Sequence, residues 1–178
     1  MKKKSNYKLS LITQSKALGG ANIAASRLSN NLKKKFKIET IYCNNSNILK
    51  YLKFLIARIL VKLFIKNEYF LNSLNLFSRI SINKLNGKIL FLNWIGEETI
   101  SLDYLISVNK PIIWTAHDMW PFTSTEHFLK DPSANYYSEK NYKNNFLKKL
   151  VLKKKKKLFK KKNIILIANS RWLYNFSR

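Results

Sequence analysis

Short apolar runs that alternate with segments of helical periodicity constrain the fold of this chain more than any other feature. The runs are too short to be helices, most contain β-branched residues, and they cover residues 7–13, 38–42, 90–92, 112–115 and 164–168. Such runs predict strands that are buried on both faces of a sheet. Repeated strand–helix–strand units predict an α/β fold, namely a three-layer Rossmann-like domain with a mostly parallel sheet.

The segments between these runs have the spacing of helices. They cover residues 21–35, 48–66 and 97–108, and a last helix is predicted to start at Ser170. Gly19-Gly20 forms the turn into the first helix, as at the start of a βαβ unit. Glu97 and Glu98 are predicted to lie in the first turn of the third helix, where acidic side chains stabilise the helix dipole.

Length and composition indicate one folded domain. The chain has 178 residues, of which 46% are hydrophobic, so it can bury a sizeable core. Cys43 is the single cysteine, which excludes an intrachain disulfide and a zinc site built from cysteines. This composition fits a reducing cytoplasm, and we expect neither a metal nor another cofactor.

The chain start resembles a secretory leader only in its first residues. The start Met1-Lys2-Lys3-Lys4 resembles the basic region of such a leader, but polar residues interrupt the segment after it, so there is no continuous apolar segment of a signal peptide. The most hydrophobic segment contains Lys53, Arg58 and Lys62, which argues against a membrane-spanning helix. We therefore expect a cytoplasmic protein.

The formal net charge of +25 makes nucleic acid, anionic lipid and phosphorylated ligands all plausible partners. An A/T-rich coding bias explains the excess of lysine and asparagine equally well. Residues 148–162 form a lysine-rich run with apolar residues at helical spacing, which we interpret as a solvated helix face. A basic nucleic-acid-binding module is a second hypothesis, but the chain lacks the aromatic, loop or zinc motifs of specific nucleic-acid binding.

The basic amphipathic segment 48–66 has two interpretations. It can lie on a membrane surface with its lysines toward anionic headgroups. It can also pack on the sheet with its cations extending to water, which is the commoner role of such helices. We favour packing, and we keep peripheral attachment to an anionic membrane as a subsidiary hypothesis.

Three groups of candidate site residues lie directly after predicted strands, where open α/β sheets bind ligands. Gly19 and Gly20 precede a helix, where backbone N–H groups favour a phosphate, although simple turn glycines are commoner. His117 and Asp118 can exchange a proton or receive a hydroxyl. A structural histidine beneath Trp114 and Trp120 is an equal alternative.

Asn93, Trp94, Glu97 and Glu98 form the third group. An amide, an aromatic face and carboxylates suit a sugar, but core packing of the tryptophan and dipole pairing of the glutamates explain them as well. His127 is interpreted as a surface residue.

Four stretches taken together resemble a known family. They are Gly-Gly-Ala-Asn-Ile-Ala-Ala-Ser-Arg-Leu at 19–28, Asn-Trp-Ile-Gly-Glu-Glu at 93–98, Pro-Ile-Ile-Trp-Thr-Ala-His-Asp-Met-Trp-Pro-Phe-Thr at 111–123 and Asn-Ser-Arg-Trp-Leu at 169–173. In this order they resemble the N-terminal half of family 4 retaining glycosyltransferases of the GT-B fold, in the colanic-acid and exopolysaccharide branch. The stretch around His117 is the most specific part.

The resemblance implies transfer of a sugar from a nucleotide-diphosphate sugar, as co-substrate, to a saccharide or lipid-linked acceptor in surface polysaccharide biosynthesis. It implies that Gly19 and Gly20 border the donor diphosphate, and that His117 and Asp118 lie beside the acceptor and the transferred sugar. The expected acceptor contacts are Asn93, Trp94, Glu97 and Trp120. Such enzymes need no catalytic metal.

The chain also departs from the family pattern. Asn93 stands where the family often has histidine, and Ser124-Thr125-Glu126-His127 stands where Gly-Gly-Cys-His is usual. Family members continue into a donor-binding domain with a Glu-x7-Glu motif, and we expect residues 1–178 to be the acceptor-side domain without it. We therefore expect little catalysis from these residues alone, because a half-site loses the advantage of positioning both substrates. A degenerate fragment without activity is a further alternative.

Overall fold

A fully parallel sheet of five strands forms the centre of the protein. The structure is a computed structural model that describes residues 7–16, 19–43, 47–65, 72–128, 145–161 and 163–177. The strand order is β2-β1-β3-β4-β5. The strands are β1 (Lys8–Thr13), β2 (Lys37–Tyr42), β3 (Ile89–Leu92), β4 (Ile112–Ala116) and β5 (Ile164–Ala168). The five predicted strands are confirmed, and no end differs by more than one residue.

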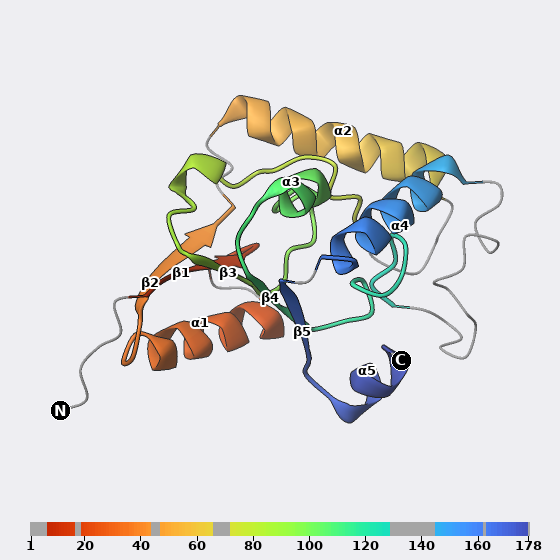
Figure 1. The fold of residues 1–178 in the computed structure, drawn as a ribbon. Helices are drawn as coiled ribbons and strands as arrows, with labels where there is room; N and C mark the ends of the chain where they lie inside the picture. The colour runs from red at the N-terminus through yellow and green to blue at the C-terminus, as the bar shows by residue number, and fades with distance from the viewer. Residues whose placement is uncertain are drawn as a thin grey trace.

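Helices cover both faces of this sheet, so the predicted three-layer Rossmann-like architecture is confirmed. They are α1 (Gly20–Leu32), α2 (Ile48–Phe64), α3 (Leu102–Ser107), α4 (Phe146–Phe159) and α5 (Arg171–Phe176), with a short 3₁₀ helix η1 (Ile82–Lys84). In Figure 1, α1 lies on one face, while α2, α3 and α4 lie on the other. The chain order reverses between β1 and β3, which is the topological switch point where such folds bind ligands.

The main apolar core lies on the side of α3 and α4. It joins residues of the central strands, such as Leu90, Leu92 and Ile112, to Leu105 of α3 and Val151 of α4, and all five are completely buried. Burial of each such side chain stabilises the fold by about 1.5 to 3 kcal/mol. This packing holds the loops after β3 and β4 against α4.

Gly87 allows two segments to approach closely at the opposite end of the sheet. A Cβ atom at this position would lie 2.3 Å from the backbone nitrogen of Ser10. The missing side chain lets the Gly87 N–H donate to the Ser10 hydroxyl at 2.8 Å. The Asn86-Gly87 turn therefore places β3 beside β1 through a contact that no other residue permits.

The helix predicted over residues 97–108 is wrong in its first part. Helix α3 begins at Leu102, after Ser101, whose side chain accepts a hydrogen bond from the Tyr104 N–H. Glu97 and Glu98 instead occupy a turn with φ of 54° and 59°. The Glu98 carboxylate accepts hydrogen bonds from the backbone N–H groups of Asn75 and Phe77, so contacts with a distant segment override the local helix signal.

Helix α2 turns much of its apolar surface to solvent. Within α2, whose residues are all described, Ala57 alone is buried. Packing on the sheet therefore accounts for only a narrow side of this helix. Among the described residues, no helix combines the length and the apolarity needed to cross a membrane. The sequence interpretations also used residues 1–4, Lys66 and Lys162, which lie outside the described residues.

Candidate functional site

The carboxyl ends of β1, β3, β4 and β5 lead into one cluster of polar side chains at the switch point. Asn93, directly after β3, donates through Nδ2 to the backbone carbonyl of Ala21 in α1 at 2.7 Å. Its Oδ1 lies 2.6 Å from Nε2 of His117, directly after β4. One asparagine thus joins the helix start behind Gly19 and Gly20 to the predicted histidine, and all of them share one rim of the sheet.

Gly19 and Gly20 leave the start of α1 open. Gly19 has a φ of 85°, which glycine adopts without strain, and Gly20 is the first residue of α1. A Cβ atom added to either glycine would meet no atom of the described residues within 4 Å. Both glycines are exposed, so the start of α1 has the steric room that close approach of an anion requires.

The hydrogen bonds of His117 define its tautomer. Asn93 Nδ2 donates to a carbonyl, so the atom facing His117 is the acceptor Oδ1, and Nε2 of His117 must carry the proton. The other ring nitrogen, Nδ1, lies 2.8 Å from Nδ2 of Asn169 and accepts its hydrogen. The half-buried ring is thus neutral, and burial lowers its pKa although the nearby Asp118 charge raises it. Displacement of the exposed Asn169 amide would free Nδ1 as a proton acceptor.

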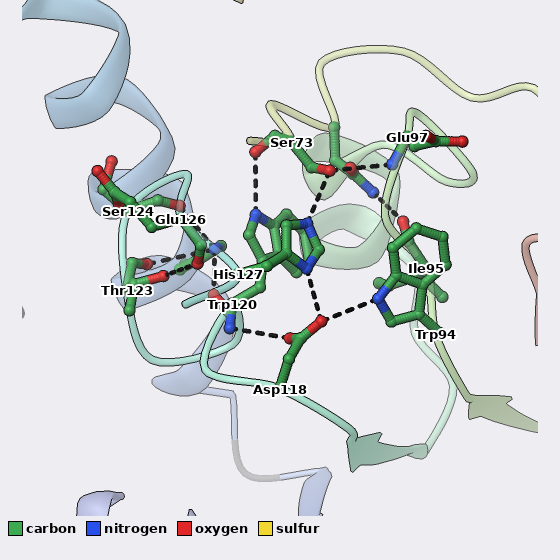
Figure 2. A network of polar contacts seen from close by, with 12 residues as sticks. Ser73, Trp94, Ile95, Glu97, Asp118, Trp120, Thr123, Ser124, Glu126 and His127 are labelled. Atoms are coloured by element: carbon green, nitrogen blue, oxygen red, sulfur yellow. Dashed lines mark hydrogen bonds and ion pairs between the residues drawn. The ribbon is translucent and has the colours of Figure 1, made fainter. Parts of the chain in front are cut away.

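Asp118 points into a buried network with His127, Trp94 and Trp120 (Figure 2). Its Oδ2 accepts from Nδ1 of His127 at 2.6 Å and from Nε1 of Trp94 at 2.9 Å, and its Oδ1 accepts from the Trp120 N–H at 3.0 Å. Burial raises the pKa of this carboxyl, but the hydrogen bond and charge of His127 and the two further donors together bring it below the usual 3.8. Asp118 is therefore an ionised carboxylate whose partners are all internal.

His127 is a central residue of this network, and its interpretation as a surface residue is wrong. It is 1% exposed, and its Nε2 lies 2.9 Å from the Ser73 hydroxyl. The rings of Trp94 and Trp120 lie against it with centroids 5.5 Å and 5.8 Å away. Its only sequence signal is the run of hydroxyl and aromatic residues before it, which suits a buried polar group.

Ser73, His127 and Asp118 have the hydrogen-bond order of a serine nucleophile, base and orienting acid. The Ser73 hydroxyl also accepts the Glu97 N–H at 3.1 Å, and the serine is 2% exposed. The adjoining cavity has a volume of about 10 Å³, which is about one water molecule. Because no substrate can reach this hydroxyl, we interpret the three residues as a structural link between the loops after β3 and β4 and the segment at Ser73.

The predicted acceptor residues differ in their access to the rim. Trp120 and Asn93 are each 2% exposed, and Nε1 of Trp120 donates to the carbonyl of Ser73. Trp94 and Glu97 are partly exposed, and the Glu97 carboxylate accepts from Nε2 of Gln14 at 2.9 Å. This hydrogen bond joins the loops after β1 and β3. No signal in the sequence indicated the part that Gln14 plays in it.

The lysine run is not simply a solvated face of α4. Lys155 is completely buried, and its ammonium group donates to the carbonyls of Trp120, Thr123 and Ser124. Its Nζ also lies 3.6 Å from the centroid of the Trp120 ring. Lys148 pairs with Glu126, and Lys161 donates to Ile106 at the end of α3. These lysines hold the loop after β4 and the end of α3 in place.

The buried carboxyl group of Glu98 is expected to make the stability of the protein depend on pH. Burial raises its pKa from 4.5 to about 7, although backbone hydrogen bonds from Phe77 and Asn75 lower it. The folded state then binds more protons than the unfolded state between these values, so the free energy of unfolding falls as pH rises, by about 3 kcal/mol in total. Urea denaturation at about pH 5 and about pH 8 measures this fall, which Glu98→Gln is expected to abolish. An unchanged pH dependence in the variant would contradict the assignment.

Among the described residues, no group of histidine, cysteine, aspartate or glutamate side chains is arranged to hold a metal ion. The half-buried Cys43 has its pKa raised by burial, so its thiol stays protonated at neutral pH. Fold and site together define a Rossmann-like α/β domain with a cluster of polar side chains at its switch point. Comparisons with family models, with curated proteins and with solved structures found no match to this chain.

Proposed function

We propose that this domain forms the acceptor side of a glycosyltransferase that uses a nucleotide-diphosphate sugar. The observation that carries the proposal is the Asn93 side chain, which connects the carbonyl of Ala21 with Nε2 of His117. It brings the exposed start of α1 and a neutral imidazole to one rim of the sheet. A diphosphate suits the exposed, glycine-lined start of a helix, and an imidazole and carboxylates suit sugar hydroxyls.

Transfer itself requires a second, donor-binding domain in this proposal. Gly19 and Gly20 contact the diphosphate, and His117 lies beside the acceptor and the transferred sugar. Asp118 acts by positioning Trp94 and the loop that carries His117, since its carboxylate is fully engaged. The acceptor is a saccharide or a lipid-linked saccharide of surface polysaccharide biosynthesis, as in the family that the chain resembles.

The proposed location is the cytoplasmic side of a membrane, with peripheral attachment through α2. Two observations support attachment: α2 is poorly buried, and residues 48–64 contain lysine and arginine but no acidic residue. A nucleic-acid partner has less support. Lys148, Lys154, Lys155 and Lys161 contact acidic side chains or backbone carbonyls of the domain itself.

A substitution at Gly20 tests the diphosphate site. An aspartate at the first position of α1 favours the helix dipole, so Gly20→Asp is expected to leave the fold intact or slightly more stable. The same charge repels a diphosphate, so affinity for uridine and guanosine diphosphates is expected to fall about tenfold relative to Gly20→Asn, a loss of about 1.4 kcal/mol. Calorimetry measures the affinities, and the amide resonances of Gly19, Gly20 and Ala21 report the place of binding.

Two results would contradict the proposal. One is equal affinity of the two Gly20 variants, with nucleotide-induced shifts confined to the lysines of α4. The other is tight, sequence-selective binding of DNA or RNA at physiological salt, measured across a salt series, which would favour a nucleic-acid-binding module. Efficient sugar transfer by the 178 residues alone would refute the requirement for a second domain.

A further inference from the structure

Helix α2 exposes a continuous aliphatic stripe. Ile48, Leu49, Leu52, Ile56, Ile59 and Leu63 are all at least 46% exposed. At about 100° of rotation per residue, these six side chains fall within about 100° of the helix circumference. Apolar residues scattered singly on a surface are ordinary, but a stripe of this length indicates a surface that is covered in use.

Charges flank this stripe on both sides. Lys53 borders one edge, and Arg58 and Lys62 border the other, as the same helical rotation shows. A helix with an aliphatic stripe between cations, and without acidic residues, is complementary to the interface of an anionic bilayer. A protein partner would need a matching acidic rim around an apolar groove, whereas an anionic membrane supplies both chemistries without special design.

A groove adjoins α2 on the side of Lys53. It has a volume of about 480 Å³, and its lining includes Lys50 and Lys53 of α2 together with Ser78, Ser81 and Ser101. None of the described residues that line it is acidic. Nζ of Lys50 donates to the Ser81 hydroxyl at 2.8 Å, so this cation is already directed across the groove. Ammonium and hydroxyl donors without a carboxylate suit a phosphate.

We infer that this groove holds the phosphate of one anionic membrane lipid while the stripe lies among the acyl chains. The inference rests on the membrane attachment proposed above, and it adds a specific headgroup site to it. Lys53 is the link, because it borders the stripe and also lines the groove. Lys50 and Ser81 then contact the phosphate from its protein side.

Vesicle flotation of the 178-residue protein tests the inference with three vesicle types. They consist of phosphatidylcholine alone, of phosphatidylcholine with phosphatidylglycerol, and of phosphatidylcholine with phosphatidic acid. We expect binding only to the two anionic types. Leu52→Gln with Ile56→Gln should abolish it while circular dichroism shows an unchanged fold, because the two residues are 46% and 48% exposed and neither belongs to the buried core.

The groove is tested by a matched pair of double variants. Lys50→Ala with Lys53→Ala removes two charges that line the groove, and Arg58→Ala with Lys62→Ala removes two charges from the same helix outside it. If the cations act only by general electrostatic attraction to the membrane, both double variants lose about 30-fold in vesicle affinity, at about 1 kcal/mol per cation. If the groove holds a headgroup, the loss of vesicle affinity is at least about tenfold larger for Lys50→Ala with Lys53→Ala than for the control pair. Ser81→Ala, which changes no charge, is expected to weaken binding about fivefold.

Each of the other possible outcomes would refute either the headgroup site alone or the headgroup site together with membrane attachment. Equal losses in the two double variants, with no effect of Ser81→Ala, would refute the headgroup site and leave membrane attachment standing. Failure of the unaltered protein to float with anionic vesicles would refute attachment and headgroup site together. Binding of inorganic phosphate in the groove without flotation would assign it to a soluble anion instead. Nucleotide binding at Gly20 is measured separately, so these results do not affect that test.

Discussion

Replacing Asp118 by alanine is expected to lower the free energy of unfolding by about 3 to 5 kcal/mol, because each buried donor that loses its partner costs about 1 to 3 kcal/mol. The carboxylate is 8% exposed and accepts from Nδ1 of His127, Nε1 of Trp94 and the Trp120 N–H. Alanine leaves all three donors without their carboxylate partner in a buried network. Urea denaturation followed by tryptophan fluorescence measures the loss.

Asp103→Ala provides the matched control. The Asp103 carboxylate also pairs with a lysine, Lys154, but 62% of the aspartate side chain is exposed, so its removal should cost at most about 1 kcal/mol. Equal losses for the two variants would show that the network around His127 contributes little. The pH dependence gives a second check. The pKa of Asp118 lies below 3.8, so its stabilising effect is complete above that pH and declines as pH falls further.

The sheet could be predicted from sequence because its signal is local. Residues 112–115 and 164–168 are apolar runs bounded by turn residues, and burial on both faces of a parallel sheet requires little more than such runs. The meeting of Gly19, Asn93 and His117 at one rim is a result of the same pattern. Once the strands are parallel, the loops after them must share one edge.

The interior of the candidate site could not be predicted, because its partners are distant in sequence. His127 pairs with Asp118, nine positions away, but also with Ser73, which lies 54 positions away. The turn at Glu98 depends on backbone donors of Asn75 and Phe77. The spacing of residues along the chain does not indicate these long-range contacts. Without them, an acidic pair before an apolar segment predicts the start of a helix.

His117 and Asp118 show how neighbours in sequence acquire separate roles. Successive side chains of an extended chain point to opposite sides, so one faces the rim and the other faces the interior. His117 reaches Asn93 and the exposed Asn169, whereas Asp118 reaches the buried His127. Substitution of His117 should therefore mainly affect ligand binding. Substitution of Asp118 should mainly affect the stability of the fold.

Replacing Lys155 by methionine is expected to lower the free energy of unfolding by about 3 to 5 kcal/mol. Methionine retains the volume of the side chain, but the carbonyls of Trp120, Thr123 and Ser124 lose their shared donor in a buried site. Burial of the ammonium group is itself unfavourable, and it lowers the pKa of Lys155 well below 10.5. That cost reduces the loss but does not reverse it, because three unpaired carbonyls remain.

Lys157→Met, an identical change at an exposed position of the same helix, should alter stability by less than about 0.5 kcal/mol. The sign of the pH dependence identifies the buried amine. With a lowered pKa in the folded state, the unfolded state binds more protons, so the unaltered protein gains stability as pH rises toward 10.5. Lys155→Met should lose this gain, whereas Lys157→Met should keep it. If both variants kept it, Lys155 would be no more than a space-filling side chain, and the loop that carries His117 and His127 would owe its position to other contacts.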